Sequence, residues 1–199
     1  MISPLSSRFV LFAIATSAAT AGQAAETERS MFDLLGGASW SQRHGEAIVG
    51  LTSLDVDGVS QDQDAWYLSA AASAISGYQA KGRPFGSILG LGASLKTWWG
   101  NDQVEVRSVA PFAYGIAGVY CDFSDRTRTE LTVRAGPGLA WTRLDNDSDL
   151  GFAWTWAVEG ALSVTKGDSV GLGVGVGYES VQVADFSQEG PYVMLRIGF

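Results

Sequence analysis

The sequence has little of what many functional sites are built from. Its 199 residues include one cysteine, Cys121, and one histidine, His44. A single cysteine cannot form an intrachain disulfide or a cysteine-rich zinc site, and a single histidine excludes a metal site that needs two. Only 17% of the residues are charged, against about 25% in an average soluble domain. The net charge of −8 argues against a nucleic-acid partner, which needs a basic face.

Long hydrophobic runs are also missing, apart from a short one near the start of the chain. The apolar run Phe9–Ala21 follows Arg8 and leads into small residues up to Ala24. These are the parts of a secretory signal peptide, and the 13 residues of the run are fewer than the roughly 20 of a membrane-spanning helix. We therefore predict a cleaved signal peptide over residues 1–24 and one exported domain over residues 25–199.

Glycine and alternation are what the rest of the chain has in abundance. There are 25 glycines, and every second residue from 171 to 177 is one of them. A period of two is typical of a β-strand. Eight such segments cover residues 31–42, 64–78, 84–99, 103–120, 128–144, 150–165, 168–183 and 190–199. Their number and length predict an all-β fold, namely an eight-stranded antiparallel transmembrane β-barrel with up-and-down meander topology.

Residues 43–63 fit this scheme least well. The segment Ala47–Leu54 is apolar enough to extend the first strand or to form a strand of its own. A ninth crossing strand would put the two ends of the chain on opposite sides of the membrane. We therefore expect an extension of the first strand or a loop.

The contents of the two strand faces favour a membrane barrel over a soluble barrel or sandwich. One face carries the large apolar residues, and the other carries mostly glycine, alanine and serine, which suits the narrow inside of a barrel. Outward aromatic residues are expected in two belts at the membrane interfaces. One belt would hold Trp40, Trp66, Trp99, Trp141 and Phe152, and the other Phe32, Tyr78, Phe85, Tyr120 and Phe199.

Charged residues within the strands are predicted to face the barrel interior. The set is nearly balanced, so most members can pair, and an isolated buried charge is unfavourable. Inward glycines would make room for these long side chains. The predicted interior charges are Asp33, Lys96, Glu105, Arg107, Glu130, Arg134, Glu159, Glu179 and Arg196. We expect a packed polar plug, and the alternative is a narrow channel lined by these groups.

The C-terminal residues Tyr192, Val193, Leu195, Ile197 and Phe199 combine a terminal phenylalanine with apolar residues on one face. This pattern resembles the signature by which bacterial outer-membrane barrels are handed to the barrel-assembly machinery. Residues 25–199 as a whole resemble small eight-stranded barrels of the OmpA transmembrane domain, OmpX and Opa type. The resemblance implies a Gram-negative outer membrane, with lipid and lipopolysaccharide as surroundings, no cofactor and acidic loops at the cell surface. It implies no site residue.

His44 is a candidate catalytic residue, because barrels that this chain resembles include enzymes that modify lipid A. Ser39, Ser41 and Glu46 lie near His44 in the sequence and would complete a triad if the fold brought them together. The deacylase type resembles a hydrolase with histidine and serine two residues apart on a strand, whereas Glu46 stands two residues after His44. We therefore expect His44 to be an exposed loop residue.

The connections predicted to lie outside the membrane are strongly acidic. They hold eleven acidic residues against Arg43 and Arg143, which gives 2 − 11 = −9. The acidic residues are Glu46, Asp55, Asp57, Asp62, Asp64, Asp102, Asp145, Asp147, Asp149, Asp185 and Glu189. Residues 145–149 depart from a calcium loop, since Leu150 stands where the invariant glycine belongs, so no metal site is expected.

These observations predict a non-enzymatic outer-membrane protein with a structural or surface-interaction role in the cell envelope. Two alternatives stay open. One is a lipid A-modifying hydrolase centred on His44, and the other is a narrow channel lined by the interior charges.

Overall fold

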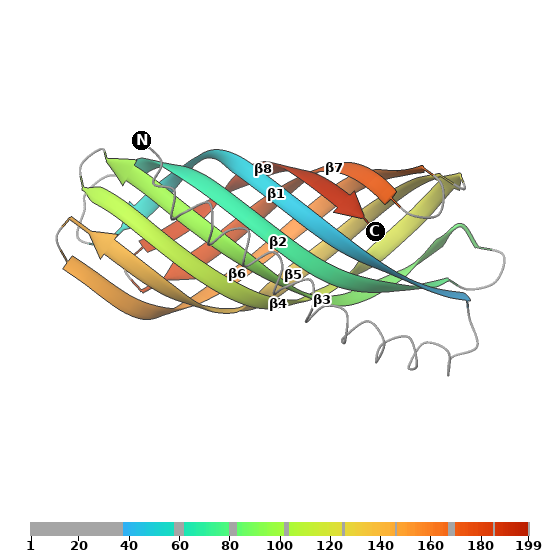
Figure 1. Ribbon diagram of the computed structural model, residues 1–199, viewed down its shortest axis with the longest axis horizontal. Coiled ribbons are helices and arrows are strands. Elements are labelled where there is room, and N and C mark those ends of the chain that lie inside the picture. Colours follow the sequence, from blue (N-terminus) through green and yellow to red (C-terminus); the bar gives the residue numbers. More distant parts are fainter. Residues whose placement is uncertain are drawn as a thin grey trace.

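A computed structural model shows one antiparallel sheet closed into a barrel (Figure 1). It describes residues 38–57, 62–79, 83–101, 104–124, 126–145, 147–166, 170–184 and 186–198. The strands are β1 (Ala38–Val56), β2 (Gln63–Gln79), β3 (Phe85–Asn101), β4 (Glu105–Ser124), β5 (Thr127–Leu144), β6 (Asp147–Lys166), β7 (Val170–Val183) and β8 (Phe186–Gly198). The predicted signal peptide, Asp33, Phe32 and Phe199 lie outside the described residues.

Each strand pairs with the next, and β8 closes the barrel on β1. Cross-strand partners can be followed once around the barrel from Glu46 on β1 through Ser94 on β3 and Gly138 on β5 to Phe186 on β8. The partner of Phe186 on β1 is Val56, ten residues beyond Glu46. This stagger makes the strands run obliquely to the barrel axis (Figure 1), as barrel closure requires.

The predicted eight-stranded meander is confirmed, and the main difference concerns the first strand. The prediction ended that strand at residue 42, but β1 continues to Val56. The reason is that alternation persists: Ile48 and Leu54 are buried inside the barrel, while Val49 points outward. Residues 47–54 are therefore the extension of the first strand.

The inward glycines were predicted to make room for charged side chains, but they make room mainly for aromatic rings. A Cβ atom on Gly92 would lie 2.5 Å from the ring of Tyr114, and one on Gly138 would lie 2.5 Å from the ring of Phe112. At these two positions the ring occupies the space that a side chain on the neighbouring strand would fill.

Two apolar clusters occupy the interior, one toward each end of the barrel. The larger lies toward the end where β1–β2, β3–β4, β5–β6 and β7–β8 connect, and contains Tyr67, Trp98 and Phe186 among others. The Trp98 ring stacks on Tyr67 with centroids 5.6 Å apart and meets Phe186 edge-on at 5.4 Å. The smaller cluster, Ile75, Ile88 and Tyr120, lies toward the opposite end.

Candidate functional site

Seven charged side chains meet inside the barrel between the two apolar clusters. None is more than 8% exposed, and together they come from six strands. We call this group the interior ionic cluster: Glu46, Lys96, Glu130, Arg134, Glu159, Glu179 and Arg196.

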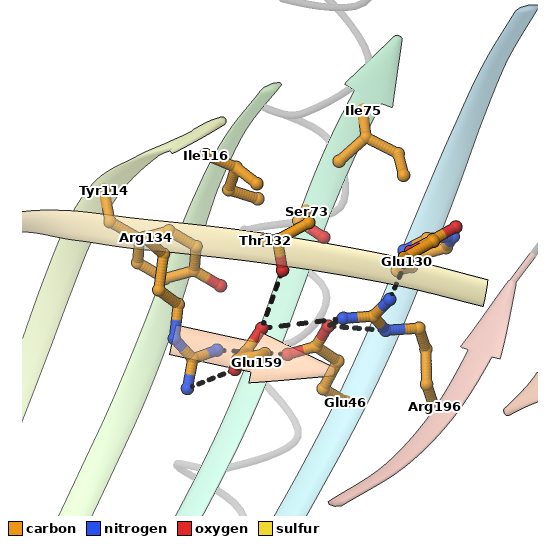
Figure 2. A pocket seen from close by; sticks show the side chains of 11 residues that line it. Glu46, Ser73, Ile75, Tyr114, Ile116, Glu130, Thr132, Arg134, Glu159 and Arg196 are labelled. Carbon is orange, nitrogen blue, oxygen red and sulfur yellow. Dashed lines mark hydrogen bonds and ion pairs between the residues drawn. The ribbon is translucent and has the colours of Figure 1, made fainter. Parts of the chain in front are cut away.

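Arg134 on β5 is one centre of the interior ionic cluster. Its Nη1 lies 3.1 Å from Glu46 Oε2, and its Nη2 lies 3.0 Å from Glu159 Oε1 (Figure 2). The same Nη2 lies 3.4 Å from Glu179 Oε1. The guanidinium also sits over the ring of Tyr114, 5.4 Å from its centroid. Arg134 therefore joins carboxylates from β1, β6 and β7.

Arg196 on β8 is the second centre. Its Nε donates to Glu46 Oε1 at 2.8 Å, and its Nη1 donates to Glu130 Oε2 at 2.6 Å (Figure 2). Its Nη2 lies 3.6 Å from Glu159 Oε2. Glu46 thus forms ion pairs with both arginines, one through each of its carboxylate oxygens.

Lys96 on β3 extends the interior ionic cluster toward the larger apolar cluster. Its Nζ pairs with Glu179, lies 3.3 Å from Thr155 Oγ1 and sits over the ring of Phe112 at 5.3 Å. The hydroxyl of Tyr67 donates to Glu179 Oε2 at 2.6 Å. Glu179 is fully buried, and these partners satisfy it, as a buried charge requires.

The geometry is that of a closed polar plug. Three cations face four carboxylates, so the formal charge is 3 − 4 = −1, and every one of the four carboxylates has an ion-pair partner. The cavity left among the cluster residues measures about 10 Å³, which is room for about one water molecule. Apolar clusters lie on both sides of it in the described interior.

Two of the predicted interior charges face outward instead. Glu105 and Arg107 form an ion pair of 2.6 Å on the outer side of β4, where the Arg107 side chain is 63% exposed. The inward residues there are Val106 and Ser108. The prediction was wrong because both faces of β4 are largely apolar, so alternation alone did not tell which face is inside.

His44 is buried in β1 at 3% exposure and faces the interior, so the prediction of an exposed loop residue was wrong. Glu46, predicted in an outer loop, is likewise inside. Ser41 is exposed on the other strand face and cannot join them. The residue directly opposite His44 is Ser73, which is also buried, a neighbour that sequence proximity could not suggest. Both line the 10 Å³ cavity, which has no space for an acyl chain.

The predicted aromatic belts lie mostly on the outer surface. Trp66, Trp99, Trp141, Phe152 and Phe85 are exposed there, and Tyr78 is half-buried on the outward face of β2. Tyr120 is the exception. It points inward at 2% exposure and packs against Ile75 and Ile88. Tyr120 follows the inward-facing Tyr114 by six residues on β4, and an even separation along a strand puts both side chains on the same face. The side chain of Trp40 lies outside the described part of the structure.

The C-terminal strand divides its residues between the two faces. Val193, Leu195 and Ile197 are exposed on the outer wall. Tyr192 faces the interior, where its hydroxyl donates to Glu159 and lies 3.3 Å from Arg134 Nη2. Tyr192 is therefore a partner of the interior ionic cluster, a role that its place in a terminal motif gave no sign of.

Exposed carboxylates gather at the end of the barrel where β1–β2, β3–β4, β5–β6 and β7–β8 connect, which we call the acidic end. They are Asp55, Asp57, Asp62, Asp64, Asp145, Asp147, Asp149 and Glu189. Asp102 and Asp185 lie outside the described residues. The connections at this end are short, because the strands run almost to the turns.

Neither a metal site nor a membrane-spanning helix is present in the described residues. No group of three histidine, cysteine, aspartate or glutamate side chains there is placed to hold a metal ion. No helix among them is long and apolar enough to cross a membrane.

Comparison with known proteins identifies the architecture but not a family. No protein-family model matches the chain, and no curated protein resembles it in sequence. The crystal structure of Neisserial surface protein A, 11% identical, matches with a TM-score of 0.54 over 81% of this chain and 97% of that one. Ail, the attachment invasion locus protein of Yersinia pestis, is 16% identical, with a TM-score of 0.49 and the same coverage. This chain has the fold of the small eight-stranded outer-membrane β-barrels.

Proposed function

We propose that the protein is a non-enzymatic outer-membrane β-barrel whose acidic end faces the outside of the cell. Its role is structural or lies in surface interactions of the envelope. The observation that carries the proposal is the inverted distribution of side chains. Large apolar residues such as Leu172, Val174 and Leu195 are exposed all around the wall, while ionised groups are buried inside. In water this arrangement would expose far more apolar surface than a monomeric protein tolerates, and in a bilayer it is favourable.

The likeness in fold to Neisserial surface protein A supports a surface protein of this class. The closed interior supports a role without catalysis on lipids, because an acyl chain does not fit the space beside His44 and Ser73. The apolar clusters on both sides of the interior ionic cluster support a role without transport. Lipid and lipopolysaccharide are the surroundings proposed for the wall. Val193, Leu195, Ile197 and Phe199 are proposed to be read by the barrel-assembly machinery, after export directed by residues 1–24.

Extraction of cell envelopes tests the membrane location. The protein should stay with the membrane in alkaline carbonate and in urea, and its gel mobility should change on boiling, as expected of a barrel that stays folded in detergent. Release by carbonate would overturn the proposal.

Cysteine labelling tests the orientation. In a Cys121→Ala background, Asp147→Cys places a thiol at the acidic end, and Arg126→Cys places one at an exposed turn of the opposite end. A membrane-impermeant maleimide should label intact cells through Asp147→Cys only. Labelling of Arg126→Cys alone would mean that the barrel has the reverse orientation.

A further inference from the structure

Two arginines stand side by side on the outer wall near the acidic end. Arg107 on β4 and Arg143 on β5 are direct cross-strand partners. Both face outward, because they alternate along their strands with Val106, Ser108 and Thr142, which face inward. Like charges directly opposite each other destabilise a sheet. They are also the two basic residues on the described outer surface near this end, where eight exposed carboxylates would offer each of them a separate partner.

The contacts that these arginines make leave donors for a further acceptor. Arg107 Nη2 pairs with Glu105 Oε1 at 2.6 Å, in a pair whose side chains are 63% and 35% exposed. Exposed pairs of this kind contribute little to stability and are easily exchanged. Arg143 donates from Nε to the backbone oxygen of Asp145 at 2.9 Å. That bond uses one of the five N–H donors of a guanidinium and holds the group beside the β5–β6 turn.

Two tryptophans flank the pair on the outer wall. Trp99 on β3 is the cross-strand partner of Arg107, and Trp141 precedes Arg143 by two residues on the same outward face. Both indoles are exposed. Exposed tryptophans on a membrane barrel mark the interface between acyl chains and headgroups. The two guanidinium groups therefore lie next to the level at which lipid phosphates sit.

We propose that Arg107 and Arg143, flanked by Trp99 and Trp141, form a binding site for the phosphate group of an outer-leaflet lipid. Paired guanidinium groups match the oxygens of a phosphate, and a bound phosphate removes the repulsion between the arginines. The acidic end repels soluble anions approaching from outside, which favours a ligand that arrives laterally within the membrane. This inference rests on the proposed membrane location and orientation.

Binding of lipid A by the refolded full barrel in neutral detergent tests the site, with native mass spectrometry as the readout. The probes are bis-phosphorylated lipid A, the same lipid with both phosphates removed, and inorganic phosphate as a competitor. The test variant is Arg107→Gln/Arg143→Gln. The matched control is Arg83→Gln/Arg126→Gln, which removes two exposed arginines from the opposite end.

The native barrel and the control should bind phosphorylated lipid A about tenfold or more tightly than the test variant does, because charge-assisted hydrogen bonds are lost. The dephosphorylated lipid should bind both forms equally weakly. Equal binding of phosphorylated lipid A by the test variant and the control overturns the site. Displacement of lipid A by millimolar inorganic phosphate also overturns it, since the ligand is then free phosphate. A heat-modifiable gel shift on the same samples shows that the barrel is folded. If the folded native barrel then binds phosphorylated lipid A no better than the test variant does, the phosphate site is overturned but the proposed function is not.

Discussion

Glu46 is the side chain on which the interior ionic cluster depends most, because it receives Arg134 on one carboxylate oxygen and Arg196 on the other. We predict that Glu46→Gln lowers the free energy of unfolding by about 3–5 kcal/mol, the range for breaking a buried ion pair. Urea unfolding of the barrel in lipid vesicles measures the change.

Asp55→Asn is the matched control for Glu46→Gln. It removes a carboxylate from the same strand, but Asp55 is exposed at the acidic end. Its effect should stay within about 0.5 kcal/mol, as for most surface substitutions. An equal loss in the two variants would contradict a structural role of the cluster.

His44 and Ser73 face each other across β1 and β2, and together they are the nearest thing to a hydrolase site in the described residues. The space beside them, about 10 Å³, excludes a lipid substrate. We predict that His44→Ala and Ser73→Ala leave the lipid A acylation pattern of the host cell unchanged, as read by mass spectrometry of extracted lipid A. A changed pattern in both variants would restore the hydrolase hypothesis.

The orientation of single side chains could be predicted from the sequence only where a strand has unequal faces. Glu130, Arg134 and Glu159 stand on faces that are otherwise mostly small or polar, and the structure places them inside. On β4 the two faces are alike: Val106 and Phe112 on one, Val109 and Val119 on the other. Alternation then gives no sign of which face is inside, and Glu105, Arg107 and Tyr120 were misassigned for this reason.

Strands pack closely where glycine lets one backbone approach another. A Cβ atom on Gly136 of β5 would overlap the carbonyl oxygen of Ala113 and lie 2.6 Å from the Cα of Tyr114 on β4. Because backbone cannot rotate away as a side chain can, we predict that Gly136→Ala destabilises the barrel by about 1–3 kcal/mol. The measurement is again urea unfolding in vesicles.

Gly160→Ala tests whether that loss comes from the close approach. A Cβ atom at Gly160 would meet nothing within 4 Å, so the substitution should change stability by no more than about 0.5 kcal/mol. A loss as large as that of Gly136→Ala would mean that glycine matters for its flexibility rather than for space.

The end of the first strand could not be predicted because polar residues inside it resemble a loop. His44 and Glu46 interrupt the apolar pattern of residues 43–54, and their burial makes sense only with partners from distant strands. Arg196, which pairs with Glu46, follows it by 150 residues. No local pattern contains such a partner, whereas the strand count depends on local alternation alone and was predicted correctly.

Across the described part of the barrel, one ionic cluster fills the interior between two apolar clusters. We predict that planar bilayers containing the protein show no reproducible conductance steps, while a wide open barrel in the same apparatus does. Steps that disappear when Arg134 is neutralised would contradict the plug and support the channel hypothesis.

The ten-residue stagger between Glu46 and Val56 has a consequence for how this chain can change in evolution. Partners across the strands point to the same side of the sheet, so the residue reached on β1 after one turn around the barrel must face inward as Glu46 does. Because side chains alternate along a strand, the number of residues between the two positions has to be even. Inserting one residue within a strand would turn part of that strand inside out, with arginine in lipid and leucine among carboxylates. Two inserted residues would keep the faces but alter the offset, and with it the diameter that Trp98 and the cluster fill. Length can therefore vary freely only in the connections between strands.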